Sequence, residues 1–430
     1  MNNATKIAIG AGVVIIAGAL ILSHHPSPSV TYPRHVHTWV SFEVIAPNVQ
    51  TSAYAPYVDW VDVTSGGNAF KGSPTYAQLH AAGIKVVPYS DPSHHVTPPT
   101  TYLNTLFTSA DWAHACNGEP VVWNKPGHTL TYINDIRNPD VAAKWKQDGD
   151  HLMATVGGFD AMFEDTADDP FSFASPAPPA DNTSPCNPVT QADWTAADYI
   201  MENAFGYPVI FNGLGSSGGG VSPRSEMLLG PALGGMDEGC DDNYNATPYA
   251  ISLGTKWLGH RDAQMLALAY GKDFVCHHLQ HADASTVTAI RMFHYASFLL
   301  LFDYATDIYS TQWTGGTSNV SVMPETLLVP NNPVLPTPTN MNVLFGRDGA
   351  YHRLYKHCAL NGVDKGQCDV VVNPTKPTSK NPGTITLIEP FTVRHVLKLS
   401  GAGILDGGTA TIISSSPTSL GSGQGLIAFP

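Results

Sequence analysis

Short apolar segments alternate with longer amphipathic stretches through most of the chain. From about residue 38 to residue 312 this pattern predicts eight strands, at 38–45, 58–63, 84–89, 159–165, 208–212, 233–238, 273–277 and 302–309. Between most of them the apolar residues recur with helical spacing, for example at 75–82, 141–156, 192–205, 250–270 and 284–300. Alternating strands and helices predict an α/β fold with a parallel sheet, and eight strands favour a closed (β/α)8 barrel over an open, doubly wound sheet.

Two long segments interrupt this alternation. Residues 91–138 separate the third predicted strand from the helix before the fourth, and they contain a predicted hairpin around residues 124–128. Residues 171–189 form a second loop, which is rich in Pro and Ser. Loops of this length in a compact domain are more often functional than not.

The pattern changes after Trp313. Residues 325–340 are rich in Pro and Asn and predict a linker. Short alternating segments follow and predict a small antiparallel, β-sandwich-like domain; they lie at 351–357, 369–372, 384–389, 393–399, 409–414 and 426–429. We therefore divide the chain into residues 1–29, a barrel at 30–325, and a linker with a C-terminal β domain at 326–430.

Residues 1–29 have the pattern of a targeting segment. Lys6 precedes an uncharged, mainly apolar run from Ile7 to Leu22. This run is shorter than the ~20 residues of a spanning helix and suits a signal peptide. Either a cleaved signal peptide or a retained membrane anchor explains it, and the second would attach the protein to a membrane. Both predict an extracytoplasmic protein that is secreted, periplasmic or anchored at the cell surface.

Composition narrows the classes of function. Only 13% of the residues are charged, and the formal net charge is −14. A nucleic-acid-binding protein would carry a basic patch, so nucleic acid is not an expected partner. Six cysteines allow up to three disulfides in an exported chain. Cys358 and Cys368 flank a hairpin-like segment and are the pair that we expect to be bonded.

The segment FDAMFEDT, residues 159–166, carries the strongest chemical signal. A strand that delivers a carboxylate at its C-terminal end is how (β/α)8 barrels present catalytic acids. Because side chains alternate along a strand, Asp165 shares a face with Ala161 and Phe163, whereas Glu164 faces the other way. Asp165 is therefore the candidate catalytic residue. The alternative is a carboxylate that only caps a loop or a helix.

A second carboxylate, Glu238, ends a similar short strand in ALGGMDEG. Glycosidic cleavage needs one carboxylic acid to protonate the leaving oxygen and a second carboxylate that acts as nucleophile or activates water. Glu238 is the best-placed partner for Asp165, and Asp237 alternates away from it. The competing interpretation is a structural turn rich in Asp and Gly.

Further polar and aromatic residues are predicted to bind substrate at the barrel rim: Tyr89, Asp91, Asn212, Trp257, His260 and Arg261. The stretch from Gly213 to Gly218 matches the G-x-G-x-x-G motif for phosphate binding. More glycines and Pro223 follow, however, where the helix of that motif would begin. We interpret this stretch as a loop at the rim.

Histidines raise the question of a metal. Asp91 with His94 and His95 offers ligand types that a metal accepts. If these residues converged with Asp165, the protein would be a metal-dependent deacetylase or esterase. Nothing else matches a known metal signature, so neither a metal nor another cofactor is expected.

Three short patches resemble a group of TIM-barrel glycoside hydrolases. DAMFED (160–165) is similar to their D-G-[apolar]-[aromatic]-x-D strand, with Ala161 in place of the usual Gly. NDIRNPDVAAKWKQDGDHLM (134–153) resembles the helix before that strand, and RLYKHCALNGVDKGQCDVVVNPT (353–375) resembles their C-terminal β segment. The chain departs from the group by an insertion at 180–189 and by Cys358, where an aromatic residue is usual.

This resemblance covers roughly residues 38–430 and implies an exported or surface enzyme that acts on carbohydrate. It implies a nucleophile-like role for Asp165. By similarity to α-galactosidases, it implies a general acid after the sixth strand, at Glu238.

The first hypothesis is therefore an exported glycoside hydrolase that cleaves a polysaccharide or glycoconjugate, with Asp165 as nucleophile or base and Glu238 as general acid. The second is a glycan-binding or structural surface protein that keeps the barrel without chemistry. The second predicts that the two carboxylates do not face one cleft and lie more than ~12 Å apart, beyond the range of inverting glycosidases.

Overall fold

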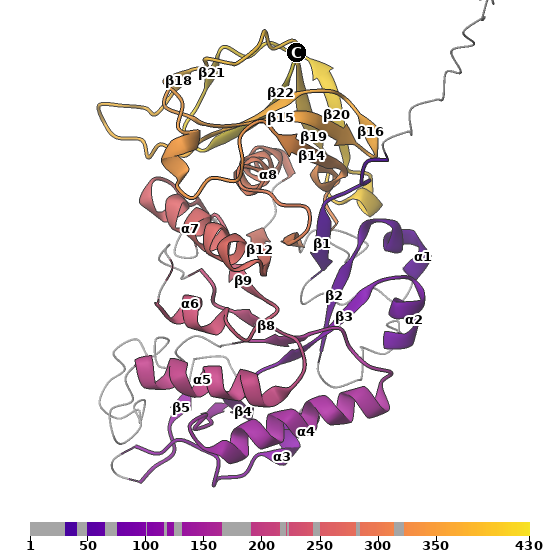
Figure 1. The fold of residues 1–430 in the computed structure, drawn as a ribbon, viewed down its shortest axis with the longest axis vertical. Helices are drawn as coiled ribbons and strands as arrows, with labels where there is room; N and C mark the ends of the chain where they lie inside the picture. The colour runs from indigo at the N-terminus through magenta and orange to yellow at the C-terminus, as the bar shows by residue number, and fades with distance from the viewer. Residues whose placement is uncertain are drawn as a thin grey trace, which may run out of the picture. The chain divides into compact units, whose positions relative to one another are not determined.

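The computed structural model describes residues 31–40, 50–64, 75–99, 101–115, 118–123, 131–165, 191–215, 221, 223–243, 250–280, 284–313 and 322–430. Contacts along the chain divide it into two units, Met1–Thr31 and Tyr32–Pro430. All the described helices and strands belong to the second unit (Figure 1). The predicted targeting segment, residues 1–29, lies outside the described residues.

Eight parallel strands close into a barrel, which confirms the predicted (β/α)8 architecture. The closed ring forms because β2 pairs with β3 on one side and with β1 on the other. In spatial order the strands are β1 (His37–Val40), β13 (Asp307–Trp313), β12 (Asp273–Gln280), β9 (Gly234–Glu238), β8 (Val209–Asn212), β7 (Met162–Glu164), β3 (Lys85–Ser90) and β2 (Trp60–Thr64).

Helices connect most of these strands and pack outside them (Figure 1). The sequence explains where several begin. Thr75 and Gln78 form a capping box at the first turn of α2, and Asn138 caps α4 with Pro139 at its first position. None of the described helices is both long and apolar enough to cross a membrane. The helices are α1 (Thr51–Tyr54), η1 (Ala55–Tyr57), α2 (Tyr76–Ala81), α4 (Pro139–Thr155), α5 (Gln191–Phe205), α6 (Pro223–Leu228), α7 (Thr255–Tyr270) and α8 (Ala284–Leu299).

Two predicted boundaries differ from the structure. The eighth strand begins at Asp307 instead of residue 302, because Phe302 packs into the cluster around α8 and a turn from Asp303 to Asp307 follows it. The helix predicted at 250–270 begins at Thr255. Residues before it form the short strand β11 (Ala250–Ile251), which pairs with β10 (Asp242–Asn243).

The long segment after β3 forms a small sheet of its own. Its three antiparallel strands are β4 (His94–Val96), β6 (Thr131–Ile133) and β5 (Val122–Trp123), and α3 (Tyr102–Leu106) lies between β4 and β5 in sequence. The pairing of β5 with β6 supports the predicted hairpin. Its turn at 124–128 and the predicted loop at 171–189 lie outside the described residues.

The C-terminal region is an antiparallel sheet, as predicted. Its spatial order is β14 (Leu328–Pro333), β15 (Tyr351–Leu360), β17 (Cys368–Asn373), β22 (Gln424–Phe429), β19 (His395–Ser400) and β20 (Thr409–Ser414), and β16 (Val363–Asp364) also pairs with β15. A separate pair joins β18 (Ile385–Thr386) to β21 (Ser419–Leu420). Three short 3-10 helices complete the region, η2 (Pro324–Leu327), η3 (Met341–Leu344) and η4 (Ile404–Asp406).

Part of the region predicted as a linker is the strand β14. Its sequence LVPNNP contains two prolines, and because proline disfavours strands the segment was predicted to be a linker. The strand lies at the edge of the sheet, where a proline does not interrupt a second ladder of hydrogen bonds.

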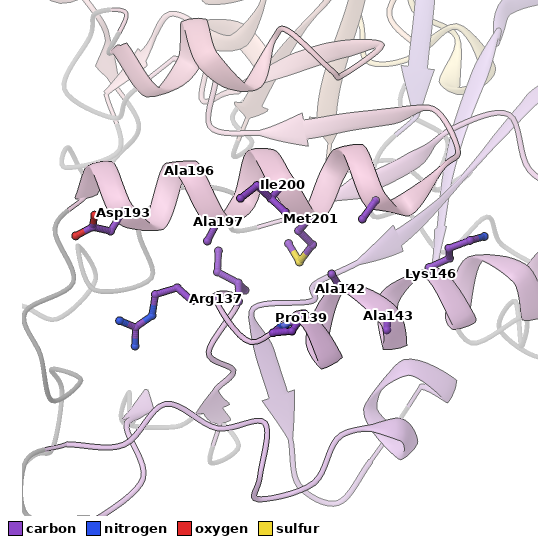
Figure 2. A pocket seen from close by; sticks show the side chains of 12 residues that line it. Arg137, Pro139, Ala142, Ala143, Lys146, Asp193, Ala196, Ala197, Ile200 and Met201 are labelled. Atoms are coloured by element: carbon purple, nitrogen blue, oxygen red, sulfur yellow. The ribbon is translucent and has the colours of Figure 1, made fainter.

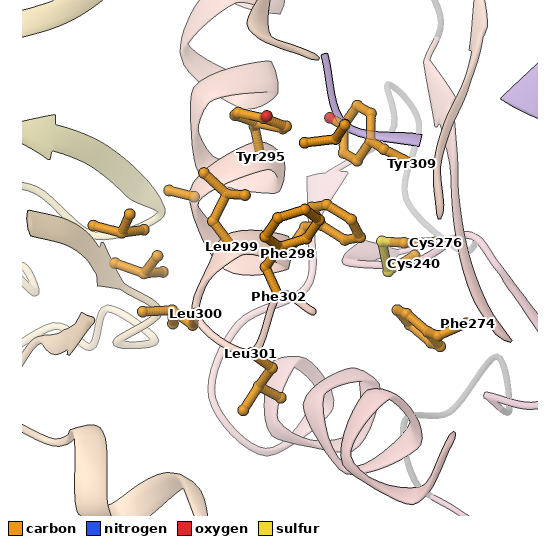
Figure 3. Packing of buried hydrophobic residues seen from close by; sticks show 14 of the residues in the cluster. Cys240, Phe274, Cys276, Tyr295, Phe298, Leu299, Leu300, Leu301, Phe302 and Tyr309 are labelled. Atoms are coloured by element: carbon orange, nitrogen blue, oxygen red, sulfur yellow. A yellow bond between two sulfur atoms is a disulfide. The ribbon is translucent and has the colours of Figure 1, made fainter. Parts of the chain in front are cut away.

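Helix α8 joins the barrel to this sheet. Residues 291–300 are buried on every side, and most of them are apolar. Figure 3 shows Tyr295, Phe298 and Leu299 of α8 near Tyr309 of β13 and the Cys240–Cys276 disulfide. On β22, a Cβ at Gly425 would lie 2.6 Å from the Met292 carbonyl oxygen, so only glycine permits this approach of the strand to α8.

Two disulfides are formed among the described residues. Cys358–Cys368 joins β15 to β17 and confirms the predicted pair. Cys240–Cys276 joins the turn after β9 to β12, and Cys116 and Cys186 lie outside the described residues. Disulfides fit an oxidising compartment.

A fully buried ion pair links α8 to the start of the C-terminal region. Arg291 Nε donates to Glu325 Oε1 at 2.9 Å, and Arg291 also contacts the other oxygen of Glu325. The third guanidinium nitrogen, Nη1, donates to the Gly401 carbonyl oxygen at 2.8 Å. Both side chains are fully buried, so either charge would be left in a low-dielectric environment if the other were removed.

We expect Glu325→Gln to lower the free energy of unfolding by about 3 kcal/mol or more, because the Arg291 charge would remain buried beside a neutral partner. Urea denaturation followed by circular dichroism measures this. Asp150→Asn breaks the exposed Lys146–Asp150 pair and serves as the control, with a stability close to that of the parent. Equal stability of both variants would contradict the expectation.

Candidate active site

The lumen of the barrel changes from apolar to polar within one step along its strands. Each strand contributes an apolar side chain to one buried cluster: Trp39, Trp60, Val87, Phe163, Ile210, Met236, Val275 and Ile308. Because side chains alternate along a strand, the described residues two positions after these apolar residues also face the lumen. These are Asp62, Tyr89, Asp165, Asn212, Glu238, His277 and Ser310.

Asn212 bridges the two predicted catalytic carboxylates. Its Nδ2 donates to Asp165 Oδ1 at 2.8 Å and to Glu238 Oε2 at 2.7 Å. Because one nitrogen contacts both, these two oxygens lie at most about 5.5 Å apart. Asp165 and Glu238 are each half-buried and Asn212 is buried. The structure therefore brings together the two carboxylates that the sequence paired.

Tyr89 holds Asp165 from the other side. Its hydroxyl donates to Asp165 Oδ2 at 2.6 Å. Burial, and then the charges of Asp165 and Asp91, raise the pKa of Tyr89 well above its usual value. The hydroxyl therefore stays protonated, and Asp165 accepts hydrogen bonds from two neutral donors.

His277 is the neighbour of Glu238 on the next strand, since the two are register partners of β12 and β9. Its Nδ1 hydrogen-bonds with the Ser310 hydroxyl at 2.8 Å. Burial lowers the pKa of His277 to about 3, so the ring is uncharged at neutral pH.

Asp91 lies just beyond the end of β3. Its carboxylate contacts His94 Nδ1 at 2.8 Å and accepts a hydrogen bond from the Ser93 hydroxyl at 2.9 Å. His95 points elsewhere, because its Nδ1 accepts a hydrogen bond from the Trp112 indole at 2.8 Å. Among the described residues, these three side chains and Asp165 do not form a group with converging ligand atoms, so the arrangement needed for a metal-dependent deacetylase is not present there.

Three other predicted rim residues lie on α7 and are buried. Trp257 donates to the Ser297 hydroxyl at 2.9 Å, and His260 Nδ1 contacts Asp237 at 2.8 Å. Arg261 is fully buried and pairs with Asp241 at 2.8 Å. Burial alone would lower the pKa of His260, but Asp237 beside it raises the pKa. Since interior partners occupy all three side chains, we leave them out of the proposed substrate site.

Glu164 follows the predicted alternation and faces away from the lumen. It lies beside Asp198 and Glu202 of α5, and all three are buried. Burial and these two neighbours raise the pKa of Glu164 well above its usual value. The residue next to Asp165 is therefore part of the packing between β7 and α5.

A groove of about 540 Å³ lies on the outside of the barrel, between α4 and α5 (Figure 2). Mainly small and apolar side chains line it, including Ala142, Ala197, Ile200 and Met201, with Arg137 and Asp193 at its edge. It is separate from the carboxylates, because the helices that form it cover the outer face of the sheet.

The glycine-rich loop after β8 packs against β9. The backbone nitrogens of Gly213 and Leu214 donate to the Met236 carbonyl oxygen. A Cβ at Gly215 would lie 2.2 Å from Asp237 Oδ1, so this position requires glycine. The described part of the motif therefore supports the interpretation as a loop that packs at the rim.

Asp62, His277 and Ser310 were not among the site residues predicted from the sequence. All three follow an inward apolar residue of the same strand by two positions. That spacing was a usable signal, but it required knowing which residue of each strand faces the lumen.

No family model matches the sequence, and no curated protein matches it. Among solved structures, the chain is similar to the glycoside hydrolase domain of PelA from Pseudomonas aeruginosa, with 13% identity and a TM-score of 0.41 over 64% of this chain and 94% of that one. It is also similar to Ega3 from Aspergillus fumigatus in complex with galactosamine, with 15% identity and a TM-score of 0.39 over 65% and 92% of the two chains.

A third similar structure is the GH36 α-galactosidase AgaB from Geobacillus stearothermophilus, with 10% identity and a TM-score of 0.42 over 92% of this chain and 56% of that one. Of these three structures, the PelA domain is a glycoside hydrolase and AgaB is an α-galactosidase.

The lowered pKa of His277 predicts a specific pH dependence of stability. Its folded-state pKa lies below the usual ~6.5, so protonation favours the unfolded chain. The stability it confers is fully present above about pH 6.5 and is lost as the pH falls toward 3. In His277→Asn, the fall in unfolding free energy between pH 7.5 and 4.5 should be smaller by about 2 kcal/mol than in the parent. Urea titrations at several pH values measure both slopes, and equal slopes would contradict the assignment.

Proposed function

We propose that the protein is an exported glycoside hydrolase that cleaves a polysaccharide or glycoconjugate with retention of anomeric configuration. The main support is the Asn212 amide, which donates to Asp165 and Glu238 at once and so fixes two carboxyl groups side by side. Two adjacent carboxyl groups at the carboxyl ends of barrel strands are what glycosidic cleavage requires.

In this mechanism Asp165 is the nucleophile. Its carboxylate attacks the anomeric carbon while the bond to the leaving oxygen breaks and Glu238 gives that oxygen its proton. In the second step Glu238 takes a proton from water. The water oxygen then attacks the anomeric carbon and releases Asp165 as a carboxylate.

The hydrogen bonds in the lumen support this division of roles. Asn212 donates to both carboxyl groups, and Tyr89 donates in addition to Asp165. Hydrogen-bond donors favour the ionised form that a nucleophile needs. His277 beside Glu238 is uncharged at neutral pH, so it adds no positive charge that would hold Glu238 ionised. Tyr89 and Asn212 thus act as positioning residues, and Asp91 stays a predicted contact for substrate.

The separation of the carboxylates supports retention. Retaining glycosidases place them about 5–5.5 Å apart, whereas inverting ones leave about 6.5–9.5 Å for a water molecule. The two oxygens that Asn212 contacts lie at most about 5.5 Å apart, which is closer than the inverting spacing. This spacing also favours an enzyme over the alternative of a non-catalytic surface protein, which predicted more than ~12 Å.

Export is supported by two observations. The N-terminal run from Ile7 to Leu22 suits a signal peptide or a membrane anchor, and two disulfides are formed among the described residues. An extracellular or cell-surface glycan is therefore the proposed substrate class.

Asp165→Asn and Glu238→Gln should each lower glycosidase activity by about 10³-fold or more, because each removes a group that forms or breaks a bond in the reaction. The measurement is release of reducing ends from a broad panel of polysaccharides by the full chain. Glu164→Gln is the matched control, since Glu164 adjoins Asp165 in sequence but faces α5, and it should keep the activity of the parent.

Activity that survives Asp165→Asn in a folded protein would contradict the proposed nucleophile. Release from no glycan, together with glycan binding that Asp165→Asn leaves unchanged, would favour the non-catalytic surface protein instead.

The first product should have the same anomeric configuration as the substrate bond that was cleaved. Proton NMR of the anomeric signals during the first minutes of the reaction, before mutarotation, distinguishes the two outcomes. An inverted product would exclude Asp165 as a nucleophile and assign it the role of a base that activates water.

A further inference from the structure

A second group of titratable side chains lies in the C-terminal region, away from the lumen. The two faces of its sheet differ. Tyr355 on β15 and Val370 and Val372 on β17 belong to the cluster around α8. His352 of β15 and Asp369 of β17 alternate with these residues and lie on the opposite face.

The segment around β18 covers that opposite face, on the side of the sheet away from α8 (Figure 1). Ile385, Leu387 and Phe391 pack there against a buried apolar cluster that includes Val371 and Val396. Glu389 belongs to the same segment, and its carboxylate oxygens are buried.

Three potential ligand atoms converge at this place. One atom each from His352, Asp369 and Glu389 lies within 4.8 Å of the others. His352 Nδ1 is 2.8 Å from Asp369 Oδ2. Sequence reasoning could not find this group, because its members lie on two strands and a loop with no metal-binding spacing.

The other nitrogen of His352 is held by a further carboxylate. His352 Nε2 lies 3.1 Å from Asp348 Oδ2. Asp348 is itself fixed, since it accepts hydrogen bonds from the backbone nitrogens of Ile388 at 2.9 Å and Ala350 at 3.1 Å. A histidine ligand whose second nitrogen donates to a fixed carboxylate is a recurrent feature of metal sites.

The charges at this place are not balanced by the protein alone. Asp369 is fully buried, and its Oδ1 and the carboxylate oxygens of Glu389 lack a donor among the described residues unless one of these two carboxyl groups is protonated and donates to the other. A buried carboxylate oxygen without a donor is unfavourable. Three carboxyl groups thus surround one imidazole, and protons or a cation must offset the negative charge.

We propose that this group binds a divalent cation of the zinc type through His352 Nδ1, Asp369 and Glu389, with Asp348 orienting the imidazole. Imidazole with carboxylates is a ligand set that zinc accepts, whereas calcium and magnesium prefer oxygen ligands alone. The cation would fasten the segment that carries Glu389 to the outer face of the sheet. This site is separate from the carboxylates in the lumen and does not depend on the proposed glycosidase activity.

The test is titration of the EDTA-treated, dialysed full chain with ZnCl2 by calorimetry, together with the visible absorption of a CoCl2 complex. We expect one site that is lost or weakened at least about 100-fold in His352→Gln and in Glu389→Gln, and about 10–100-fold in Asp348→Asn. The cobalt bands should change in the same variants, and zinc should raise the melting temperature of the parent but not of Glu389→Gln.

His357→Gln is the matched control. His357 lies on the same strand and pairs with Asp364 at 2.8 Å, but it is 41% exposed. This variant should bind zinc like the parent, which separates the proposed site from adventitious binding by the other histidines of a chain that has 18.

Absence of zinc binding by the parent would overturn the proposal and leave protons to balance the charges. Zinc affinity unchanged in both His352→Gln and Glu389→Gln would also overturn it, by locating the ion elsewhere. Because Gln replaces Glu389 with a neutral group of the same shape, loss of binding in that variant with an unchanged circular dichroism spectrum supports the site itself.

Discussion

Closure of eight parallel strands into a ring is the constraint from which the site follows. Parallel strands all end at the same rim, and the two-residue alternation of side chains directs every second residue into the lumen. Asn212 is 47 residues from Asp165 and 26 residues from Glu238 in sequence, yet its amide group bonds both because strands β7, β8 and β9 are adjacent. A different order of strands would separate them.

The outward residues of the same strand ends hold these inward residues in place. Asp237 contacts His260 of α7, and the Cys240–Cys276 disulfide ties the turn after Glu238 to β12. Buried polar contacts on the outer face thus limit the movement of the strands that carry the carboxylates. A catalytic pair needs this kind of support, since a displacement of 1 Å is enough to reduce catalysis strongly.

The C-terminal sheet shares its core with the barrel through α8. Buried apolar side chains of α8 contact both regions, and the buried Arg291–Glu325 pair and the close approach of Gly425 fix the helix against the C-terminal region. The opposite face of the sheet has a separate small core, which includes Val371 and Val396. The group of His352, Asp369 and Glu389 lies beside this second core. One face of the sheet therefore packs against α8, and the other combines a small apolar core with titratable side chains.

The sequence by itself determined the local elements and the main candidates. The two-residue alternation in DAMFED was enough to separate Asp165 from Glu164, and the boundaries of most strands and helices were close, because these signals lie in consecutive residues. Because β14 contains two prolines, it was not predicted as a strand. Its position at the edge of the sheet, where proline is tolerated, depends on which strands pair with it. Trp257, His260 and Arg261 looked like rim residues, and only packing of α7 against the barrel decided that they are buried. Tertiary structure alone decided that Asn212 bridges Asp165 and Glu238 and that His352, Asp369 and Glu389 converge, because contacts between distant segments depend on strand order and register, which no local pattern encodes.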